Sequence, residues 1–264
     1  MNSLQPRTIG AVNYVGLYTL VKREVGRFVN VYLQTIVAPV ITTLLFYTVF
    51  ALAFGGVARE INGLPFLEFL APGLIMMTMV QNAFANTSSS MVIAKVQGNI
   101  VDILLPPLSP IEIYVGYVVG GIARGVVVGG VTGLVMSMFV DIHIHSWFYI
   151  LSYGVLGTLL LSSLGLAGGI WSDKFDHIAA VTNFVVTPLT FLSGTFYALE
   201  SLPEFWQKLA HYNPFFYMID GFRSGFIGVS DGNLTLGLVY LLVINIGLAT
   251  LSYRMLSTGY KIKA

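Results

Sequence analysis

The sequence predicts an all-α membrane protein, a single transmembrane domain over residues 1–264 with six transmembrane helices. Hydrophobic residues make up 56% of the chain and charged residues only 9%, and the mean hydropathy is +0.80. A soluble domain of this size needs far more charge to cover its surface. In addition, six apolar stretches are each long enough to cross a hydrocarbon core of roughly 30 Å. Together these observations indicate a multi-pass protein.

Composition also excludes several classes of function. The formal net charge of +1 gives no electrostatic footprint for nucleic acid, so we expect no nucleic-acid partner. The chain has no cysteine, which excludes disulfides and thiol chemistry without fixing the compartment. The first apolar run contains Asn13 and Tyr14 and precedes Lys22 and Arg23. A cleavable signal peptide carries its charges before the apolar stretch, so this run is not predicted to be one.

The first predicted element is an amphipathic helix over residues 15–28. Its apolar residues recur at helical spacing: Leu17, Leu20, Val21, Val25 and Phe28. Lys22, Arg23 and Arg27 take the other side of the helix. Such a basic helix lies in the cytoplasmic headgroup layer, where anionic lipid attracts it, so membrane lipid is an expected partner. The alternative is a plain juxtamembrane linker.

The apolar stretches predict six spans, at residues 31–54, 69–94, 113–140, 147–171, 178–197 and 234–253. An even number of spans places both termini on one side of the membrane. That side, with the N-terminal segment, carries most of the positive residues outside the spans: Lys95, Lys174, Arg254, Lys261 and Lys263. The opposite loops carry fewer: Arg59, Lys208 and Arg223. The positive-inside rule therefore predicts that both termini are cytoplasmic.

Prolines and glycines within the spans predict local geometry. Pro39 in the first span and Pro188 in the fifth are expected to kink their helices or to free a carbonyl. The third span carries glycines at spacings near four: Gly116, Gly120, Gly121, Gly125, Gly129, Gly130 and Gly133. This spacing lets helix backbones approach closely. We expect tight packing within the bundle, with a dimer contact as the alternative.

The cytoplasmic loop 95–110 predicts a short helix that binds a partner. Gly98 and Asn99 favour a turn, and an apolar helix from Ile100 to Leu105 follows and ends at Pro106-Pro107. A short helix with apolar knobs can insert into a groove on another protein. The candidate contact residues are Gly98, Asn99, Ile100, Asp102, Ile103, Leu104 and Pro107. A simple cytoplasmic turn is the alternative.

Polar residues inside the spans are candidates for lining a path through the membrane, because such residues face other helices or water rather than lipid. The residues predicted to line the path lie in the second and fifth spans: Thr78, Gln81, Asn82, Asn86, Thr182, Asn183 and Thr187. The first span adds Gln34, Thr35, Thr42 and Thr43. Neutral polar groups can pass an amphipathic molecule without trapping it. The alternative for any one residue is a helix–helix hydrogen bond worth roughly 1 kcal/mol.

Arg124 is the one charged residue deep in a predicted span. An unpaired guanidinium there is costly, so it should pair with an acid or a carbonyl, or extend to an interface. Glu112 lies too far along the helix to reach it, at about 1.5 Å per residue. The sequence names no partner for Arg124 and favours a structural role over binding.

The external segment 198–230, between the fifth and last spans, predicts a broken helix pair that enters the membrane boundary. The preceding apolar helix breaks at Ser193-Gly194, and Pro203 and Pro214 mark the starts of new segments. Trp206 and neighbouring tyrosines suit a membrane–water boundary, where aromatic rings keep one end hydrated. The alternative is an ordinary external loop that carries one amphipathic helix.

Two loop clusters contain residue types that bind metals. Asp141, His143 and His145 lie in an external loop, and Asp173, Asp176 and His177 lie in a cytoplasmic one. A zinc site needs three or four convergent ligands with supporting contacts, and paired carboxylates can hold Mg²⁺ beside a pyrophosphate. Short solvated loops are polar in any case, so we expect no metal site in this chain.

The segment from Leu192 to Arg223 reads L-S-G-T-F-Y, then L-P-E-F-W-Q, then N-P-F-F-Y-M-I-D-G-F-R. This pattern resembles the C-terminal signature of type-2 ABC exporter permeases, and the chain is most similar to short bacterial permeases of drug, nodulation-factor or capsule export. Loop 95–110 is similar to their coupling helix, with a match at Gly98, Ile103, Leu104, Pro107, Leu108 and Ser109. The resemblance covers essentially the whole chain and does not identify the cargo.

The resemblance implies a permease homodimer in the bacterial inner membrane that exports an amphipathic drug, lipid or lipid-linked saccharide. The sequence contains no P-loop, so ATP and Mg²⁺ would bind to a separate ATPase subunit, and no cofactor is expected in this chain. The external helix pair would gate release, through Ser193, Gly194, Pro203, Trp206, Asn213 and Pro214. Aspartate at Ile103 or Leu104 should uncouple transport from ATP while the protein stays folded.

Two other functions fit parts of the sequence. An intramembrane lipid-modifying enzyme could use Asp173, Asp176 and His177 as its reactive groups. Alanine at these positions would then abolish turnover, whereas a permease would keep its effect on the ATPase. A membrane anchor that transports nothing would not need the polar second span.

Overall fold

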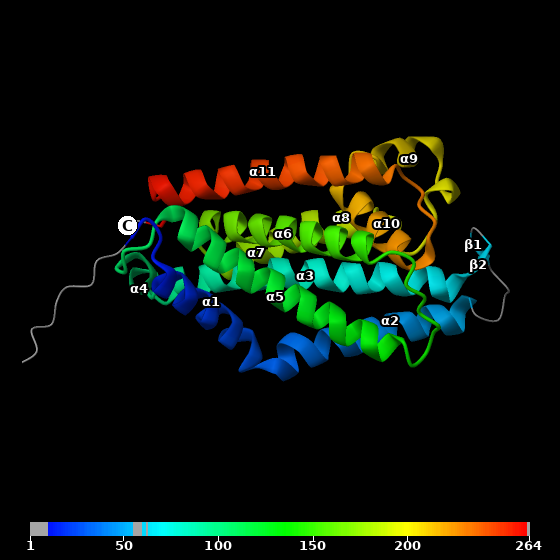
Figure 1. The fold of residues 1–264 in the computed structure, drawn as a ribbon, viewed down its shortest axis with the longest axis horizontal. Helices are drawn as coiled ribbons and strands as arrows, with labels where there is room; N and C mark the ends of the chain where they lie inside the picture. The colour runs from blue at the N-terminus through cyan, green and yellow to red at the C-terminus, as the bar shows by residue number, and fades with distance from the viewer. Residues whose placement is uncertain (1–9, 55–59, 62, 263–264) are drawn as a thin grey trace, which may run out of the picture.

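Long helices lie side by side along the longest axis of the molecule (Figure 1). The computed structural model describes residues 10–54, 60–61 and 63–262. Within these ranges five helices are long and apolar enough to cross a membrane, which confirms the predicted all-α membrane fold. They are the π-helix η1 (Leu33–Val37) joined to α2 (Ala38–Phe54), α3 (Phe66–Val96), α5 (Pro110–Met136), α6 (Trp147–Trp171) and α11 (Leu234–Thr258).

The shorter elements occupy the two ends of the bundle or complete its wall. The cytoplasmic candidates are α1 (Tyr14–Val29) and α4 (Val101–Leu104). The predicted external segment contains the 3₁₀ helix η3 (Leu199–Ser201), α9 (Glu204–Ala210) and α10 (Pro214–Ile227). Two-residue strands β1 (Glu60–Ile61) and β2 (Leu64–Pro65) pair as an antiparallel hairpin.

The predicted fifth span, residues 178–197, is a rod of three short segments. These are α7 (Phe175–Val181), the π-helix η2 (Thr182–Val186) and α8 (Thr187–Phe191). Together they cover 175–191, roughly 26 Å at 1.5 Å per residue, which is a little shorter than the hydrocarbon core. The rod ends before residue 197 because a turn follows in which Gly194 has a φ of 75°. The other predicted spans differ from the observed helices by a few residues at their ends.

Helix α3 is the centre of the bundle. It contacts α2, α5, α6 and α10, and 78% of its most apolar window is buried within the chain, against 17% for α2 and for α11. Its polar residues therefore face protein and not lipid, which is where such residues are least costly. The glycines of α5 allow this packing: a Cβ at Gly120 would lie 2.5 Å from Glu24, and one at Gly125 would lie 2.8 Å from the Met79 carbonyl. The predicted close approach within the bundle is confirmed.

The start of α1, helix α4 and the end of α11 lie at one end of the bundle, and β1, β2 and α9 lie at the other (Figure 1). This arrangement agrees with an even number of crossings. Of the residues that the charge pattern uses, Arg59 and Lys263 lie outside the described residues.

Two prolines are accompanied by widened helical turns. Pro39 follows η1 by two residues, and Pro188 follows η2 by two residues. Proline has no N–H and its ring crowds the carbonyl four residues earlier, so an ordinary α-turn is disfavoured there. In both places the wider turn closes instead from i to i+5: Ala38 N–H donates to the Leu33 carbonyl, and Thr187 N–H donates to the Thr182 carbonyl. Such π-turns often occur at functional sites.

Candidate functional site

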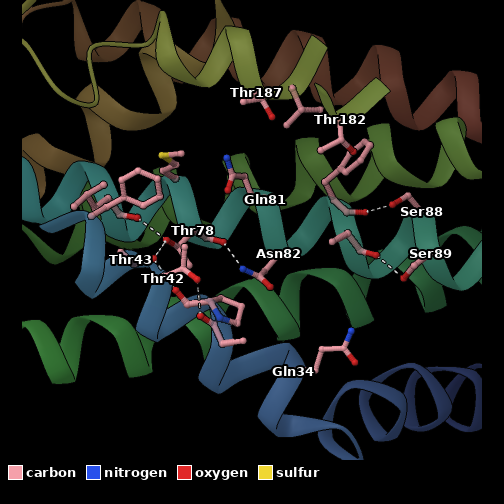
Figure 2. Close-up of a pocket in the computed structure, with 18 of the residues that line it drawn as sticks. Gln34, Thr42, Thr43, Thr78, Gln81, Asn82, Ser88, Ser89, Thr182 and Thr187 are labelled. Carbon is pink, nitrogen blue, oxygen red and sulfur yellow. Dashed lines mark hydrogen bonds between the residues drawn. The ribbon is translucent and has the colours of Figure 1, made fainter. Parts of the chain in front are cut away.

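A groove of about 530 Å³ lies between α3, the η1–α2 helix and the α7–η2–α8 rod. Both widened turns contribute to its walls, through Gln34 on one side and Thr182 on the other. Figure 2 shows Thr182 and Thr187 across the groove from Thr42 and Thr43. Apolar residues make up much of the remaining wall: Ala38, Pro39, Phe46, Leu74, Met77, Phe84, Ala85, Ile178 and Val186.

The groove gathers most of the residues that were predicted to line a path. Five of them lie in its wall: Thr78, Gln81, Asn82, Thr182 and Thr187. Asn86 does not line it, because its side chain is fully buried against α1. Asn183 does not line it either, because it is exposed on another face of η2. These two residues are therefore not part of the groove, since polarity shows that a residue avoids lipid but does not show which way it faces.

Hydroxyl and amide groups in the groove are held by neighbouring residues. Thr43 and Thr78 hydroxyls form a hydrogen bond of 2.7 Å, and the Asn82 amide donates to the Thr78 carbonyl at 3.0 Å. The residues that line the groove include no charged side chain. The groove can therefore bind a ligand with both apolar and neutral polar parts, and its lining offers no general acid, general base or metal ligand set.

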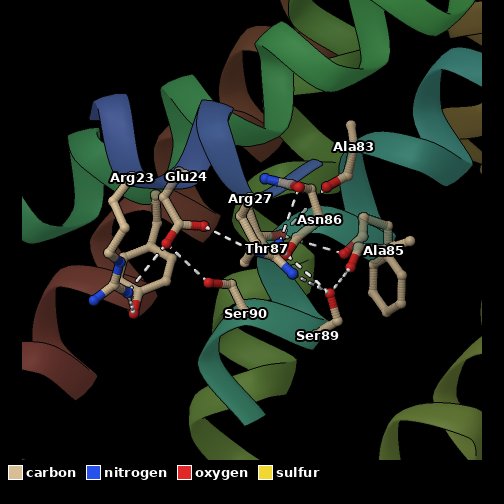
Figure 3. Close-up of polar contacts among 11 residues, drawn as sticks. Arg23, Glu24, Arg27, Ala83, Ala85, Asn86, Thr87, Ser89 and Ser90 are labelled. Carbon is tan, nitrogen blue, oxygen red and sulfur yellow. Dashed lines mark hydrogen bonds and ion pairs between the residues drawn. The ribbon is translucent and has the colours of Figure 1, made fainter. Parts of the chain in front are cut away.

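Helix α1 contacts α3 through a polar network that includes Glu24, Arg27, Asn86, Ser89 and Ser90 (Figure 3). Arg27 donates to the carbonyl of Asn86 at 2.6 Å, to its side-chain oxygen at 3.0 Å and to the Ser89 hydroxyl at 3.2 Å. Glu24 is fully buried, accepts from Ser90 at 2.9 Å and lies 3.2 Å from Arg23. The network fixes α1 to the same stretch of α3 that leads into the groove.

The network corrects the predicted direction of the basic helix residues. Lys22 and Arg23 are exposed as expected, but Arg27 turns inward to α3. Glu24 was missed altogether, although its position was readable. It lies four residues from Leu20 and four from Phe28, and these three form the buried stripe of α1.

The structure provides a partner for Arg124. Its Nη2 donates to the side-chain oxygen of Asn82 at 2.9 Å, so the two residues join α5 to the groove wall on α3. The predicted partner classes were an acid or a carbonyl. A side-chain amide supplies the carbonyl oxygen, and its donor group binds the Thr78 carbonyl.

In loop 95–110 the structure places a single helical turn, α4, with one of its apolar residues facing inward. Ile103 is 3% exposed and packs with Met91, Ile113 and Ile170. The prediction that Ile103 contacts a partner, and that aspartate there leaves the protein folded, was therefore wrong. A helix of four residues is too short for a readable period, so the sequence could not identify its inner side.

The outer side of α4 carries the exposed apolar residues. Val101, Leu104 and Leu105 are 53%, 39% and 75% exposed. Gly98, at a φ of 76°, forms the turn before α4. Asn99, Asp102 and Pro107 are also exposed, and Ile100 is half-buried. The Pro107 carbonyl accepts from the Asn13 side chain at 3.2 Å, which ties the loop to the start of α1.

The loop Asp173–His177 is held by lysines. Lys261 donates to Asp173 at 2.7 Å and to the Trp171 carbonyl at 3.0 Å. Lys95 lies 3.8 Å from Asp173 and donates to the carbonyls of Ile170 and Ser172. The hydrogen bond from Lys261 lowers the pKa of Asp173 and raises the pKa of Lys261, so both groups are charged at neutral pH.

These contacts describe a clasp between the C-terminal segment and the loop after α6. The Asp173 N–H donates to His177 Nδ1 at 3.3 Å, and the His177 ring lies against Trp171. In the part of the chain that the structure describes, no three His, Cys, Asp or Glu residues are arranged to hold a metal ion. This applies both to the Asp173 loop and to Asp141, His143 and His145.

The external segment is tied to the end of the α7–η2–α8 rod. Asn213 is buried, caps α10 by accepting from the Phe215 N–H at 3.0 Å, and donates to the Leu189 carbonyl at 2.7 Å. The Ser193 hydroxyl donates to the Thr190 carbonyl. Pro203 and Pro214 begin α9 and α10 as predicted, and Trp206 is 45% exposed. Through Asn213 and Ser193 the segment is hydrogen-bonded to this end of the rod and covers it as a cap.

Arg223 was counted as a charge in an external loop, and this was wrong. It is 2% exposed, donates to the Gly194 carbonyl at 2.6 Å and lies 3.7 Å above the Phe69 ring. Asp220, also missed, accepts from the N–H groups of Asp231 and Gly232 at 2.9 and 3.0 Å. Both belong to the D-G-F-R stretch, whose charges at i and i+3 were the available signal.

Known proteins show similarity over the same residues. The sequence profile of the family described as ABC-2 type transporter matches residues 15–227. Inner membrane transport permease YadH of Escherichia coli strain K12 is 39% identical over 246 residues, which is 93% of this chain and 96% of the relative. Nodulation protein J of Rhizobium leguminosarum bv. viciae is 25% identical over 184 residues, 69% of this chain and 71% of the relative.

Proposed function

The chain belongs to the ABC-2 type transporter family, and from this premise we propose that it is the permease subunit of an ATP-driven exporter. It would work as a homodimer with a separate ATPase subunit and move an amphipathic cargo outward. ATP and Mg²⁺ would bind to the ATPase subunit and not to this chain. The relative named an inner membrane transport permease supports placement in the bacterial inner membrane.

The groove beside α3 is the observation that carries this proposal. Its wall combines an apolar background with neutral hydroxyl and amide groups from three separate helical segments. Such a wall can accompany a molecule that has an apolar and a polar part, and it contains no fixed charge that would hold the cargo. The two π-turns lie on opposite sides of the groove, and such turns are frequent at functional sites.

A second copy of the chain would complete the path. The groove is bounded by α2 on one side, and only 17% of the apolar window of that span is buried within the chain. A partner subunit placed against α2 would cover the open side of the groove. In a closed C₂ dimer the same surface serves both copies, so two grooves would face each other across the axis.

The exposed residues of α4 would receive the ATPase. Leu104 and Leu105 offer apolar side chains at the same end of the bundle as the two termini, and a groove on the partner could bind them. Movement of α4 would reach the groove along two connections, through Lys95 to the end of α6 and through the loop to α1, which binds α3 by Arg27. Lys95, Lys174, Arg254 and Lys261 are consistent with a cytoplasmic location for this end.

The test is co-purification with a P-loop ATPase from the same genome, reconstituted in nanodiscs. We expect the wild-type chain to bind the ATPase and to change its ATP turnover. Leu104→Asp together with Leu105→Asp should abolish that binding while the melting temperature stays within a few degrees, because both side chains are exposed. Val229→Asp is the matched control, since Val229 is 40% exposed and lies after α10 in the external segment.

Ile103→Asp distinguishes coupling from folding. It would bury a carboxylate among Met91, Ile113 and Ile170, so we expect a lower melting temperature and poor recovery of folded protein. Normal ATPase binding by the Leu104, Leu105 double variant would contradict the coupling assignment. A wild-type chain that binds no ATPase in any lipid would contradict the proposed function as a whole.

A further inference from the structure

Two arginines from different helices meet on the asparagines of α3. Arg27 of α1 donates to Asn86 at 2.6 and 3.0 Å, and Arg124 of α5 donates to Asn82 at 2.9 Å. Asn82 and Asn86 are one helical turn apart on α3, so the two guanidinium groups approach the same stretch of that helix. We refer to Arg27, Arg124, Asn82 and Asn86 as the arginine cluster.

The charges around the arginine cluster do not balance. Glu24 lies 3.7 Å from Arg27 and also pairs with Arg23 at 3.2 Å. No carboxylate among the described residues forms an ion pair with Arg124. A guanidinium at membrane depth is costly without a counter-charge. The cluster is therefore able to accept one more negative group than the chain itself supplies.

The unused hydrogen-bonding capacity of the arginine cluster is mostly that of donors. Arg27 Nε, Asn86 Nδ2 and Arg124 Nε are buried, and none has an acceptor within hydrogen-bond distance in the described part of the chain. Glu24 Oε2, which also has no hydrogen-bond partner there, lies 3.7 Å from Arg27 Nε, so Asn86 Nδ2 and Arg124 Nε are the donors without a nearby acceptor. A ligand that satisfied them would have to bring several acceptor oxygens. Phosphate and carboxylate groups do so, and they match the fork geometry of a guanidinium.

Two residues of the arginine cluster line separate cavities, Arg27 a cleft and Asn82 the groove. A cleft of about 590 Å³ lies beside α1 and is lined by Lys22, Arg23, Arg27, Asn30 and Asn99 among others, with no acidic residue in its lining. The groove lies on the other side, with Asn82 and Ser89 in its wall. Arg27 lines the cleft and donates at 3.2 Å to Ser89, which lines the groove. Arg124 lines neither space, but it donates to Asn82 of the groove wall. A molecule that moved from the cleft to the groove would pass the cluster.

We propose that the arginine cluster binds the acidic head group of the cargo, a phosphate or carboxylate, as an amphipathic molecule passes from the basic cleft beside α1 into the neutral groove. This inference rests on the proposed transport function and adds the chemical class of the cargo. The basic cleft attracts the anion, Arg124 supplies the missing counter-charge, and the neutral groove beyond does not retain it.

The first experiment measures lipid preference in purified protein. The chain is placed in phosphatidylcholine nanodiscs with trace amounts of spin-labelled phosphatidylglycerol or spin-labelled phosphatidylcholine of the same chain length, and the immobilised fraction is recorded. We expect the wild-type chain to favour phosphatidylglycerol roughly fivefold. Arg124→Gln should reduce this preference to less than about twofold, whereas Arg254→Gln removes an equal charge at an exposed position and should retain it.

A second variant supplies the counter-charge from within the protein. Asn82→Asp places a carboxylate where Arg124 already donates at 2.9 Å. We expect it to abolish the preference for phosphatidylglycerol without lowering the melting temperature, because it pairs the guanidinium internally. This variant keeps the proposal testable if Arg124→Gln fails to fold, and a purely structural Arg124 would leave lipid preference unchanged in it.

Several outcomes would overturn the inference. A preference that survives in both Arg124→Gln and Asn82→Asp would show that the head group binds elsewhere. If millimolar inorganic phosphate displaced the labelled phosphatidylglycerol from the protein, the site would bind a free anion and not an amphipathic molecule. Equal retention of the two lipids by wild-type protein that still binds its ATPase would reject the cluster as a head-group site and leave the proposed function intact. Failure to bind the ATPase tests that function separately.

Discussion

Two regions of the bundle hold arginines in different ways: Arg223 is buried, whereas Arg27 and Arg124 are half-buried. At the end predicted to be external, which holds β1, β2 and α9, Arg223 donates to the backbone carbonyl of Gly194 and lies over the Phe69 ring. In the inner network, on the side of the bundle towards α4, Arg27 and Arg124 bind side chains and one carbonyl of α3, and Asn82 lies about midway along that helix. Backbone carbonyls of a turn cannot move without moving the turn, whereas side-chain partners can change rotamer. Arg223 is therefore held by the turn, whereas Arg124, whose partner is the Asn82 side chain, is able to exchange partners, and Arg27 can do so only at its side-chain contacts.

This difference agrees with the roles proposed for the two regions, with segment 198–230 as a gate for release and the arginine cluster as a site for the head group. The external cap is stabilised further by Asn213, which holds the Leu189 carbonyl, and by Asp220, which caps the turn before α11. A cap built in this way opens as a unit or stays closed. The inner network has spare donors in the arginine cluster and can accept a ligand without first breaking a turn.

Of the variants that test this comparison, Arg223→Ala should lose the most stability. It removes the donor to Gly194, leaves that buried carbonyl unpaired and creates a cavity beside Phe69, so we expect a loss of about 4 kcal/mol of stability. Thermal or denaturant unfolding in detergent would measure it. Arg223→Lys keeps the charge without the planar stacking and should recover part of the loss. A loss below about 1 kcal/mol for Arg223→Ala would show that the external cap is not held by this residue.

Glu24→Gln tests the inner network and should lose less stability than Arg223→Ala. It keeps the shape of the side chain but removes the one carboxylate paired with Arg23 and Arg27, and we expect a loss of about 2 kcal/mol. Arg27 would still be held by Asn86 and Ser89, which limits the loss. Glu204→Gln breaks the exposed pair with Lys208 and serves as the control, with an expected change below about 0.5 kcal/mol.

If Glu24→Gln proved as damaging as Arg223→Ala, the inner end would be as rigid as the external cap. The adaptable network proposed for the head group would then have no physical basis. Measuring both variants in the same detergent and at the same pH makes the two losses directly comparable.

The sequence predicted the parts of the fold that depend on transfer of apolar residues from water to lipid. Helix α6 begins and ends at the predicted residues, Trp147 and Trp171. The fifth span was predicted too long, because its end depends on the turn at Gly194, which Arg223 holds from 29 positions away. Local propensity and hydropathy contain no information about such a distant contact.

The second limit of the sequence-based prediction was the direction in which each side chain faces. Thr78, Gln81 and Asn82 were predicted to line a path and do line the groove. Asn86 and Ile103 were assigned to surfaces and proved to be buried. Asn86 lies beneath α1, and Ile103 faces the core from a single helical turn. Both errors have the same cause. The residues next to Asn86 and Ile103 in the sequence do not determine which side of each helix another element covers.

Breaking the clasp at Asp173 should change stability least of the three variants. The change can be recognised by its dependence on pH. Lys261 lowers the pKa of Asp173 below its ordinary value of 3.8, so the pair contributes stability above that value and loses it as pH falls through the lowered pKa. Lys261, whose pKa is raised above 10.5, contributes fully below that value and loses its contribution only as the pH rises above it. The melting temperatures of Asp173→Asn and wild type should therefore differ slightly at pH 7 and converge as the pH falls below 3.8 and through the lowered pKa of Asp173. Because Asp173 is exposed, a large difference at pH 7 would show that the loop does more than clasp the C-terminal segment, and would return the Asp173–His177 loop to consideration as a reactive site.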